Sequence, residues 1–165
     1  MADMIVEEGK YKIAQAADDL IFPSISSCVS ITLAFANGIR YGGHAILVPE
    51  GASMWTISEM CADLQRQVAL PGATRIYVVG DTATWDGVWD QLPQTRGLQR
   101  AGVNRIADLA RYFGARVRFA ATNVINPPVN AVDVTFYSRT ARNNAGLLTV
   151  INRANGALVG AATRW

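Results

Sequence analysis

Residues 29–48 read VSITLAFANGIRYGGHAILV. Apolar residues alternate with small or polar ones over 29–35, which is the two-residue period of a β-strand. Asn37-Gly38 follows, and this dipeptide favours a tight turn between antiparallel strands. Residues 39–48 then predict the returning strand, which ends at Pro49-Glu50-Gly51. The stretch therefore predicts a β-hairpin.

The remaining chain adds strands and two helices. Thr56 and Glu59 form the pattern of a capping box, and apolar residues at helical spacing follow until Pro71-Gly72. A second amphipathic helix is predicted over about 103–113, with Gly114 as its cap, and a loop over 81–97. Further strands are predicted at 10–16 and in the segment before it, and at 75–80, 116–122, 132–138, 147–152 and 157–163. The pattern predicts an α+β fold: one domain, residues 1–165, with mostly antiparallel, β-sandwich-like sheets and two main helices.

Composition narrows the function classes. The chain has 165 residues, half of them hydrophobic, and only 17% charged, which is typical of one globular domain. The net charge of +2 is small and the arginines are spread along the sequence, so we expect no nucleic-acid partner. No apolar run reaches membrane-spanning length, and residues 1–8 do not read as a signal peptide. We expect a monomer that works in the cytoplasm, or in a host cytosol after delivery, without membrane association.

Cys28 and His44 are the candidate catalytic residues. His44 is the only histidine of the chain, and Cys28 is one of two cysteines. An imidazole beside a thiol can take its proton, and the resulting thiolate is a strong nucleophile. The alternative interpretation is a buried structural cysteine and a hydrogen-bonded core histidine. One histidine with two distant cysteines falls short of a zinc set, so no metal site is expected.

The hairpin register decides between these interpretations. A two-residue turn at Asn37-Gly38 sets His44 opposite Ile31, and its side chain then points away from Cys28. A β-bulge at Gly42-Gly43, or a longer turn, brings both side chains to the same face. We predict that the Cys28 sulfur lies within about hydrogen-bond reach of a His44 ring nitrogen.

Serines before the cysteine are candidates for supporting roles. Ser26 and Ser27 lie in a loop that can stabilise an oxyanion or bind substrate, and Gly43 leaves room for a substrate chain. A third group usually orients the imidazole of such a pair. The candidates are Ser24, Ser26, Ser27 and a backbone carbonyl, and we take Ser24 as the third catalytic residue.

The segments 26–33 and 41–49 resemble the core motif of the chemoreceptor glutamine deamidases (CheD). The same Cys–His core resembles the catalytic domains of cytotoxic necrotizing factor and Burkholderia lethal factor. Residues 101–109 and 113–117 are similar to the helix start and the helix-to-strand turn of the CheD family. Where that family often has a threonine that assists the histidine, this chain has Phe22.

The resemblance implies a thiol-dependent protein glutamine deamidase, acting as a toxin, an effector or a bacterial regulator. It implies that Cys28 attacks the glutamine amide of a protein substrate, that His44 transfers the protons, and that no cofactor is needed. Two other functions stay open: a cysteine protease or transglutaminase-like acyl transferase, and a non-catalytic binding module of the same fold.

Overall fold

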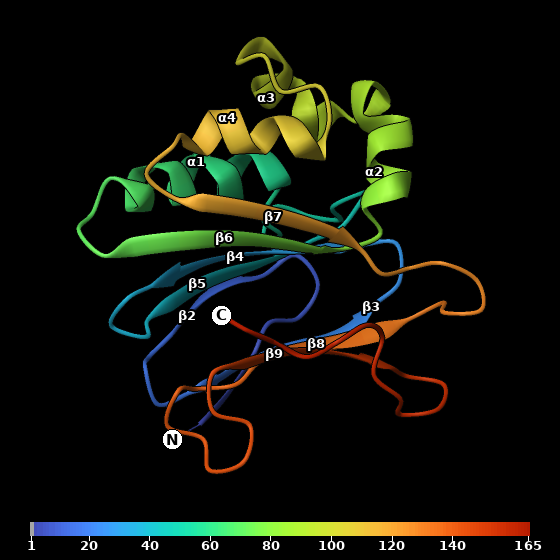
Figure 1. Cartoon of the computed structure of the whole chain (residues 1–165). Coiled ribbons are helices and arrows are strands. Elements are labelled where there is room, and N and C mark those ends of the chain that lie inside the picture. Colours follow the sequence, from blue (N-terminus) through green and yellow to red (C-terminus); the bar gives the residue numbers. More distant parts are fainter. Residues whose placement is uncertain (1) are drawn as a thin grey trace.

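Two five-stranded sheets face one another, and helices cover the outer face of one of them (Figure 1). The computed structural model describes residues 2–165. Sheet A has the order β1 (Asp3–Ile5), β3 (Asp19–Ile25), β8 (Val132–Phe136), β9 (Leu147–Asn152) and β10 (Thr163–Arg164). Sheet B has the order β2 (Tyr11–Ala14), β5 (Arg40–Ala45), β4 (Val29–Phe35), β6 (Ala73–Gly80) and β7 (Arg118–Asn123). The α+β fold predicted from the sequence is confirmed.

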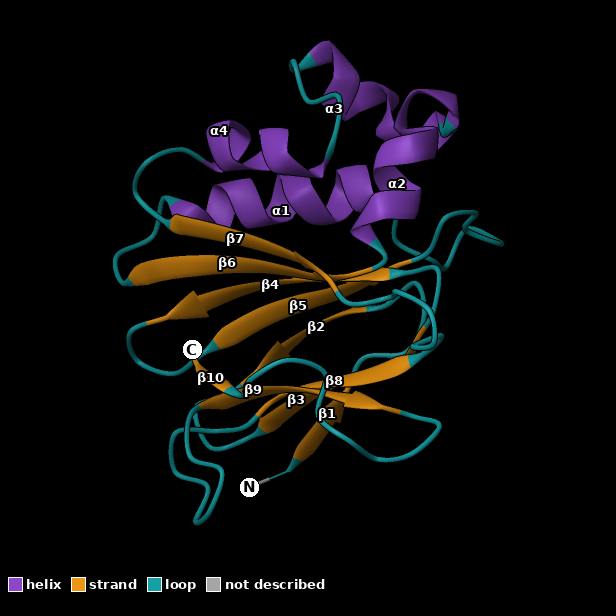
Figure 2. Cartoon of the chain, turned by 45° about the vertical axis from the view of Figure 1, so that its right-hand side comes forward, coloured by secondary structure: helices purple, strands orange, loops and turns teal. Residues whose placement is uncertain are grey.

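The helical layer lies on sheet B alone (Figure 2). It contains α1 (Ile57–Val68), α2 (Thr82–Val88), α3 (Arg96–Arg100) and α4 (Leu109–Phe113), with short 3₁₀ turns at Trp89–Gln91, Pro93–Thr95 and Ile106–Asp108. Sheet B is therefore covered on both faces, and every residue of β4 is buried. One apolar cluster joins sheet B to the helices and the other fills the space between the sheets.

The first predicted helix is confirmed together with its cap. α1 begins after Thr56, whose hydroxyl accepts the Glu59 N–H while the Glu59 carboxylate accepts the Thr56 N–H. These two reciprocal bonds satisfy backbone donors that the first turn of a helix leaves free. The helix then packs its apolar stripe on sheet B.

The prediction of a loop over residues 81–97 is wrong. Asp81 caps α2 by accepting the Thr84 N–H, and Trp85 and Trp89 lie four residues apart, both fully buried. Two large rings at this spacing lie on the same side of a helical segment, so their burial stabilises the turns between them. The acidic side chains around them gave the segment the composition of a loop.

Other boundaries also differ from the prediction. The second helix begins with a 3₁₀ turn at Ile106–Asp108 rather than at residue 103, although it does end at Gly114, where φ is +86°. β3 was not predicted, because Pro23 and Ser24 interrupt its pattern and its register shifts there. The sheets are mixed, since β1 pairs with β3 and β6 with β7 in parallel. The last predicted strand is reduced to a bridge at Leu158 and the short β10.

A three-residue turn joins β4 to β5. The Phe35 N–H donates to the Ile39 carbonyl, and Gly38 in the turn has a φ of +91°. The ladder then pairs Ser30 with His44 and runs without a shift to the β5 end. The longer turn, rather than a bulge at Gly42-Gly43, therefore sets the register.

Within residues 2–165, none of the helices has the length and apolar character that crossing a membrane requires.

Candidate active site

The inner face of sheet B brings Cys28 and His44 together. His44 on β5 pairs directly with Ser30 on β4, and directly paired residues project to the same face. Cys28 stands two residues before Ser30, so it shares that face. Cys28 Sγ and a His44 ring nitrogen lie within 4.8 Å of each other, and both side chains are buried. The two groups are therefore close together, but no hydrogen bond joins them, so hydrogen-bond reach stays a prediction.

The Val6 carbonyl orients the imidazole of His44. It lies 2.9 Å from Nδ1, and because a carbonyl only accepts, Nδ1 must carry the proton. The other ring nitrogen, Nε2, is therefore an acceptor in the neutral ring. Nε2 is buried and has no hydrogen-bond partner among the described residues. The ring is held in the tautomer that a general base requires.

The segment between β1 and β2 encloses His44. This segment crosses from sheet A to sheet B, and its Val6 N–H donates to the Ile21 carbonyl of β3. The His44 N–H donates to the Lys10 carbonyl, and the His44 carbonyl accepts the Gly9 N–H. The crossover therefore fixes both the backbone and the ring of His44.

Burial keeps both groups neutral at rest. Removal from water raises the pKa of the Cys28 thiol to about 11, and the nearby Glu8 and Asp81 carboxylates add to this rise. Burial also lowers the pKa of His44, against the smaller opposing effects of the Val6 bond and of Glu8 and Glu7. A thiol and a neutral imidazole therefore face each other at pH 7, and the nucleophile would form only as the proton moves to the ring.

The serine segment before Cys28 lies at the sulfur. Hydrogen bonds from the Ser26 backbone and the Ser27 side chain oppose the rise in the thiol pKa, because they stabilise the thiolate. Trp85 Nε1 on α2 donates to the Ser27 carbonyl at 3.0 Å, and the Asp81 N–H donates to the Cys28 carbonyl at 2.9 Å. The start of α2 thus holds the segment that carries the thiol.

Ser24 and Gly43 lie away from the sulfur and the imidazole. Ser24 is exposed, has a φ of +59°, and donates its backbone N–H to Asp133, whereas the imidazole donates its hydrogen bond to the Val6 carbonyl. Gly43 faces α1, where a Cβ would lie 2.5 Å from Met60 Sδ. Gly42 faces the other sheet, where a Cβ would lie 2.7 Å from the Phe22 ring. Close packing, rather than room for substrate, accounts for these two glycines.

Phe22 contacts the imidazole from sheet A. Its ring packs edge-on against that of His44, with centroids 6.3 Å apart. This is the position at which the CheD pattern has a threonine. In this chain Phe22 contributes an apolar contact, and the Val6 carbonyl accepts the hydrogen bond that the imidazole donates.

Glu8 is the site residue that sequence reasoning missed. One of its carboxylate oxygens lies within 4.8 Å of the ligand atoms of Cys28 and His44, and its side chain is exposed on the turn before β2. Glu8 lies 20 residues before Cys28, so no local sequence pattern connects the two. The crossover between the sheets brings Glu8 close to Cys28 and His44.

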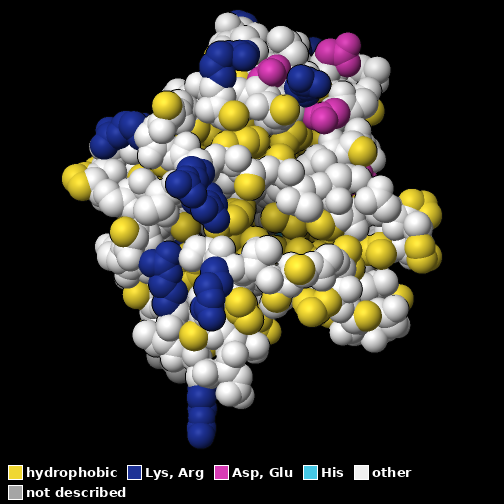
Figure 3. Space-filling view, in the orientation of Figure 1, with side chains coloured by type: hydrophobic (Ala, Val, Ile, Leu, Met, Phe, Trp, Pro, Cys, Tyr) yellow, Lys and Arg dark blue, Asp and Glu magenta, His cyan; other side chains and the backbone are white. Residues whose placement is uncertain are grey.

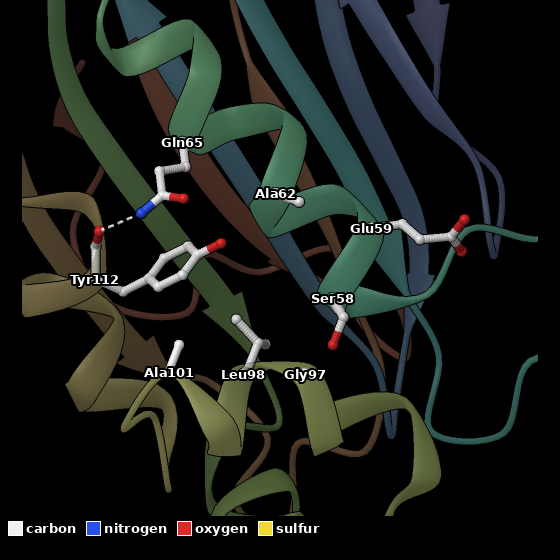
Figure 4. A pocket seen from close by; sticks show the side chains of 8 residues that line it. All are labelled: Ser58, Glu59, Ala62, Gln65, Gly97, Leu98, Ala101 and Tyr112. Atoms are coloured by element: carbon white, nitrogen blue, oxygen red, sulfur yellow. Dashed lines mark hydrogen bonds between the residues drawn. The ribbon is translucent and has the colours of Figure 1, made fainter.

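The larger surface hollows lie elsewhere. One of about 650 Å³ lies between α1 and the segment that includes α3 and Tyr112, and neither Cys28 nor His44 lines it (Figure 4). Another, of about 680 Å³, is lined by five arginines: Arg75, Arg116, Arg118, Arg139 and Arg164. Figure 3 shows several basic side chains at the left and middle of the face it displays, and others beside the acidic side chains at the top.

Comparison with known proteins identifies a similar fold. No family model matches the chain, and no curated protein matches its sequence. Among solved structures, it is similar to the C-terminal domain of CNFy from Yersinia pseudotuberculosis, with a TM-score of 0.50 and 8% sequence identity. The likeness covers 99% of this chain, which spans 62% of the other. It therefore extends over the whole of the described fold, and at this identity it concerns the fold alone.

Proposed function

We propose that this protein is a thiol-dependent glutamine deamidase that acts on a protein substrate, as a toxin or effector. The observation that carries the proposal is the His44 ring: Nδ1 is anchored on the Val6 carbonyl, while Nε2 is free and the Cys28 thiol lies nearby. The likeness to the C-terminal domain of CNFy supports it, because the sequence motif points independently to the necrotizing-factor group.

The proposed reaction hydrolyses a glutamine side-chain amide. His44 takes the thiol proton as Cys28 Sγ attacks the amide carbon, and N–H groups of the Ser26–Cys28 segment stabilise the oxyanion. The imidazolium then protonates the leaving nitrogen, and ammonia departs. Water, losing its proton to His44, adds to the thioester, and the thiol leaves with that proton. Glutamate and the original thiol are the products.

The test measures conversion of glutamine to glutamate by mass spectrometry in proteins of a cell lysate incubated with the purified chain. Because Cys28 is the proposed nucleophile and His44 takes part in every proton transfer, Cys28→Ser and His44→Ala should each lower the rate about 10²–10⁴-fold. Cys61→Ala is the matched control, since Cys61 is fully buried on α1 and should leave the rate unchanged. Deamidation by Cys28→Ser at the wild-type rate would overturn the proposal.

The same incubation distinguishes the rival chemistries. Cleaved chains would favour a cysteine protease, and incorporation of an added amine at glutamine would favour an acyl transferase. A non-catalytic binding module is favoured by one observation: Cys28 is only 3% exposed and its thiol pKa is raised to about 11. Capture of a partner without any change in its mass would support that function instead.

A further inference from the structure

The groups around Cys28 offer three kinds of metal ligand at one point. A thiol sulfur from Cys28, a ring nitrogen from His44 and a carboxylate oxygen from Glu8 all lie within 4.8 Å of one another. Thiolate, imidazole and carboxylate are the ligand types that zinc accepts in proteins. Three protein ligands and a water molecule would complete a four-coordinate zinc ion.

The state of His44 is an independent observation that points to a ligand. Its Nε2 is an acceptor atom, fully buried, with no partner in the described chain. A buried acceptor without a partner is energetically costly, so a bound cation would remove this penalty. Moreover, Nδ1 already donates to the Val6 carbonyl, and zinc-ligating histidines generally hold such a bond on their second nitrogen. The Val6 carbonyl therefore already holds the ring in the orientation that a metal ligand needs.

The geometry needs only a small adjustment. With Zn–S near 2.3 Å and Zn–N near 2.0 Å, ligand atoms of a tetrahedral zinc lie roughly 3.3–3.7 Å apart. Since the three atoms lie within 4.8 Å of one another, they must close by at most about 1.5 Å, which side-chain rotation can supply. His44 lies on β5 and Cys28 directly before β4, whereas Glu8 is exposed on a turn and can move. The exposed side of Glu8 also gives the ion a way in.

We propose that Glu8, Cys28 and His44 form a three-ligand zinc site. Binding forms a Zn–S, a Zn–N and a Zn–O bond, and the thiol proton passes to solvent. Occupancy removes the nucleophile and its base at once, so zinc would hold the enzyme inactive; this consequence, unlike the site itself, rests on the proposed function.

The test uses Co²⁺ as a spectroscopic probe of the purified, metal-free protein. A thiolate-to-cobalt charge-transfer band and the visible bands of four-coordinate cobalt are expected, and added Zn²⁺ should displace both. Cys28→Ser should abolish the charge-transfer band, and His44→Ala and Glu8→Gln should each weaken binding at least about tenfold. Glu7→Gln is the matched control: Glu7 is the exposed neighbour of Glu8, and cobalt affinity should not change.

Three outcomes would overturn the site: no band at millimolar Co²⁺, a charge-transfer band that persists in Cys28→Ser, or equal weakening by Glu7→Gln and Glu8→Gln. Circular dichroism of each variant separates loss of a ligand from loss of the fold. Deamidation by a chain that binds no metal would overturn this proposal and leave the proposed function standing. Cobalt binding at Cys28 by a chain that never deamidates would overturn the proposed function and leave the zinc site standing.

Discussion

At the scale of the residue, burial makes the chemistry of Cys28 and His44 depend on each other. At a thiol pKa of about 11, only about one Cys28 in ten thousand is a thiolate at pH 7. The imidazole is neutral as well, because its pKa is lowered. Neither residue is reactive by itself, so an activity that depends on Cys28 must also depend on Nε2 of His44.

The first prediction concerns the charge of Glu8. In Glu8→Gln one negative charge that raises the thiol pKa is lost, so alkylation of Cys28 by iodoacetamide at pH 8 should become about two- to fivefold faster. The measurement is mass spectrometry of the labelled chain in the presence of a chelator. Glu7→Gln should leave the rate unchanged, and a slower rate in Glu8→Gln would contradict the assignment.

The second prediction concerns acid. Because the pKa of His44 is lower in the folded state than in the unfolded one, the unfolded chain binds more protons as the pH falls. The contribution of His44 to stability is complete above its ordinary pKa of about 6.5 and is lost progressively below it, with a slope of up to about 1.4 kcal/mol per pH unit.

Urea denaturation at pH 7.5 and at lower pH values checks this prediction. His44→Gln should lower the free energy of unfolding at pH 7.5, and the fall in that free energy on acidification should be shallower than in the wild type. An equally steep fall in the two proteins would mean that His44 is not the group that titrates.

At the scale of the element, the start of α2 positions the segment that carries Cys28. Gly80 ends β6 with a φ of +156°, and a Cβ there would lie 2.3 Å from the Cys28 carbonyl oxygen. One turn further, Trp85 donates to the Ser27 carbonyl. The start of α2, which the sequence predicts as a loop, thus holds the backbone of the segment that carries the thiol.

The third prediction compares two indole hydrogen bonds. Trp85→Phe and Trp89→Phe each remove a bond to a carbonyl, of Ser27 and of Val103 respectively, and each should lower the free energy of unfolding by about 1–3 kcal/mol. Only Trp85→Phe should also change the alkylation rate of Cys28, because only that bond reaches the serine segment. Equal labelling of the two variants would disprove this support.

The fourth prediction concerns the approach of two backbones. Gly80→Ala should shift the Cys28 carbonyl, lower the free energy of unfolding by about 1–3 kcal/mol and alter the reactivity of Cys28. Gly87→Ala, on α2, is the control, because a Cβ there meets nothing within 4 Å. Denaturation and labelling of both variants test the contact, and a harmless Gly80→Ala would contradict it.

At the scale of the whole molecule, Arg40 joins the two sheets. Its side chain is fully buried between them and donates to the carbonyls of Gly38, Phe136, Gln15 and Asp18, while its guanidinium stacks on Trp165 at 4.6 Å. Burial lowers its pKa to about 10, so it stays charged at pH 7. One side chain thus satisfies backbone acceptors from four places in the chain.

The fifth prediction follows from this network. Arg40→Ala should lower the free energy of unfolding by about 3–5 kcal/mol, because it leaves buried carbonyls without donors and a cavity between the sheets. Arg153→Ala is the control: its pair with Asp133 is half exposed, and the loss should stay below about 1 kcal/mol. Urea denaturation of both variants measures the difference, and similar losses would refute the role of Arg40.

Local pattern in the sequence determined several features of this protein. Strand alternation over residues 29–35, the capping box at Thr56 and the likeness of the Cys28 and His44 segments to deamidase motifs all lie within short windows of sequence. They predicted the α+β fold and the closeness of thiol and imidazole. The sequence left the length of the turn open. One residue more or less in the turn moves every side chain of the following strand to the other face of the sheet.

Tertiary structure alone decided the rest of the site. The Val6 carbonyl, the Glu8 carboxylate and the Trp85 indole reach it across 38, 20 and 58 residues of chain respectively. The arginines spread along the sequence likewise meet at one hollow. No local periodicity records such contacts, because they follow from how the crossover between the sheets and the start of α2 close around the strand that begins after Cys28.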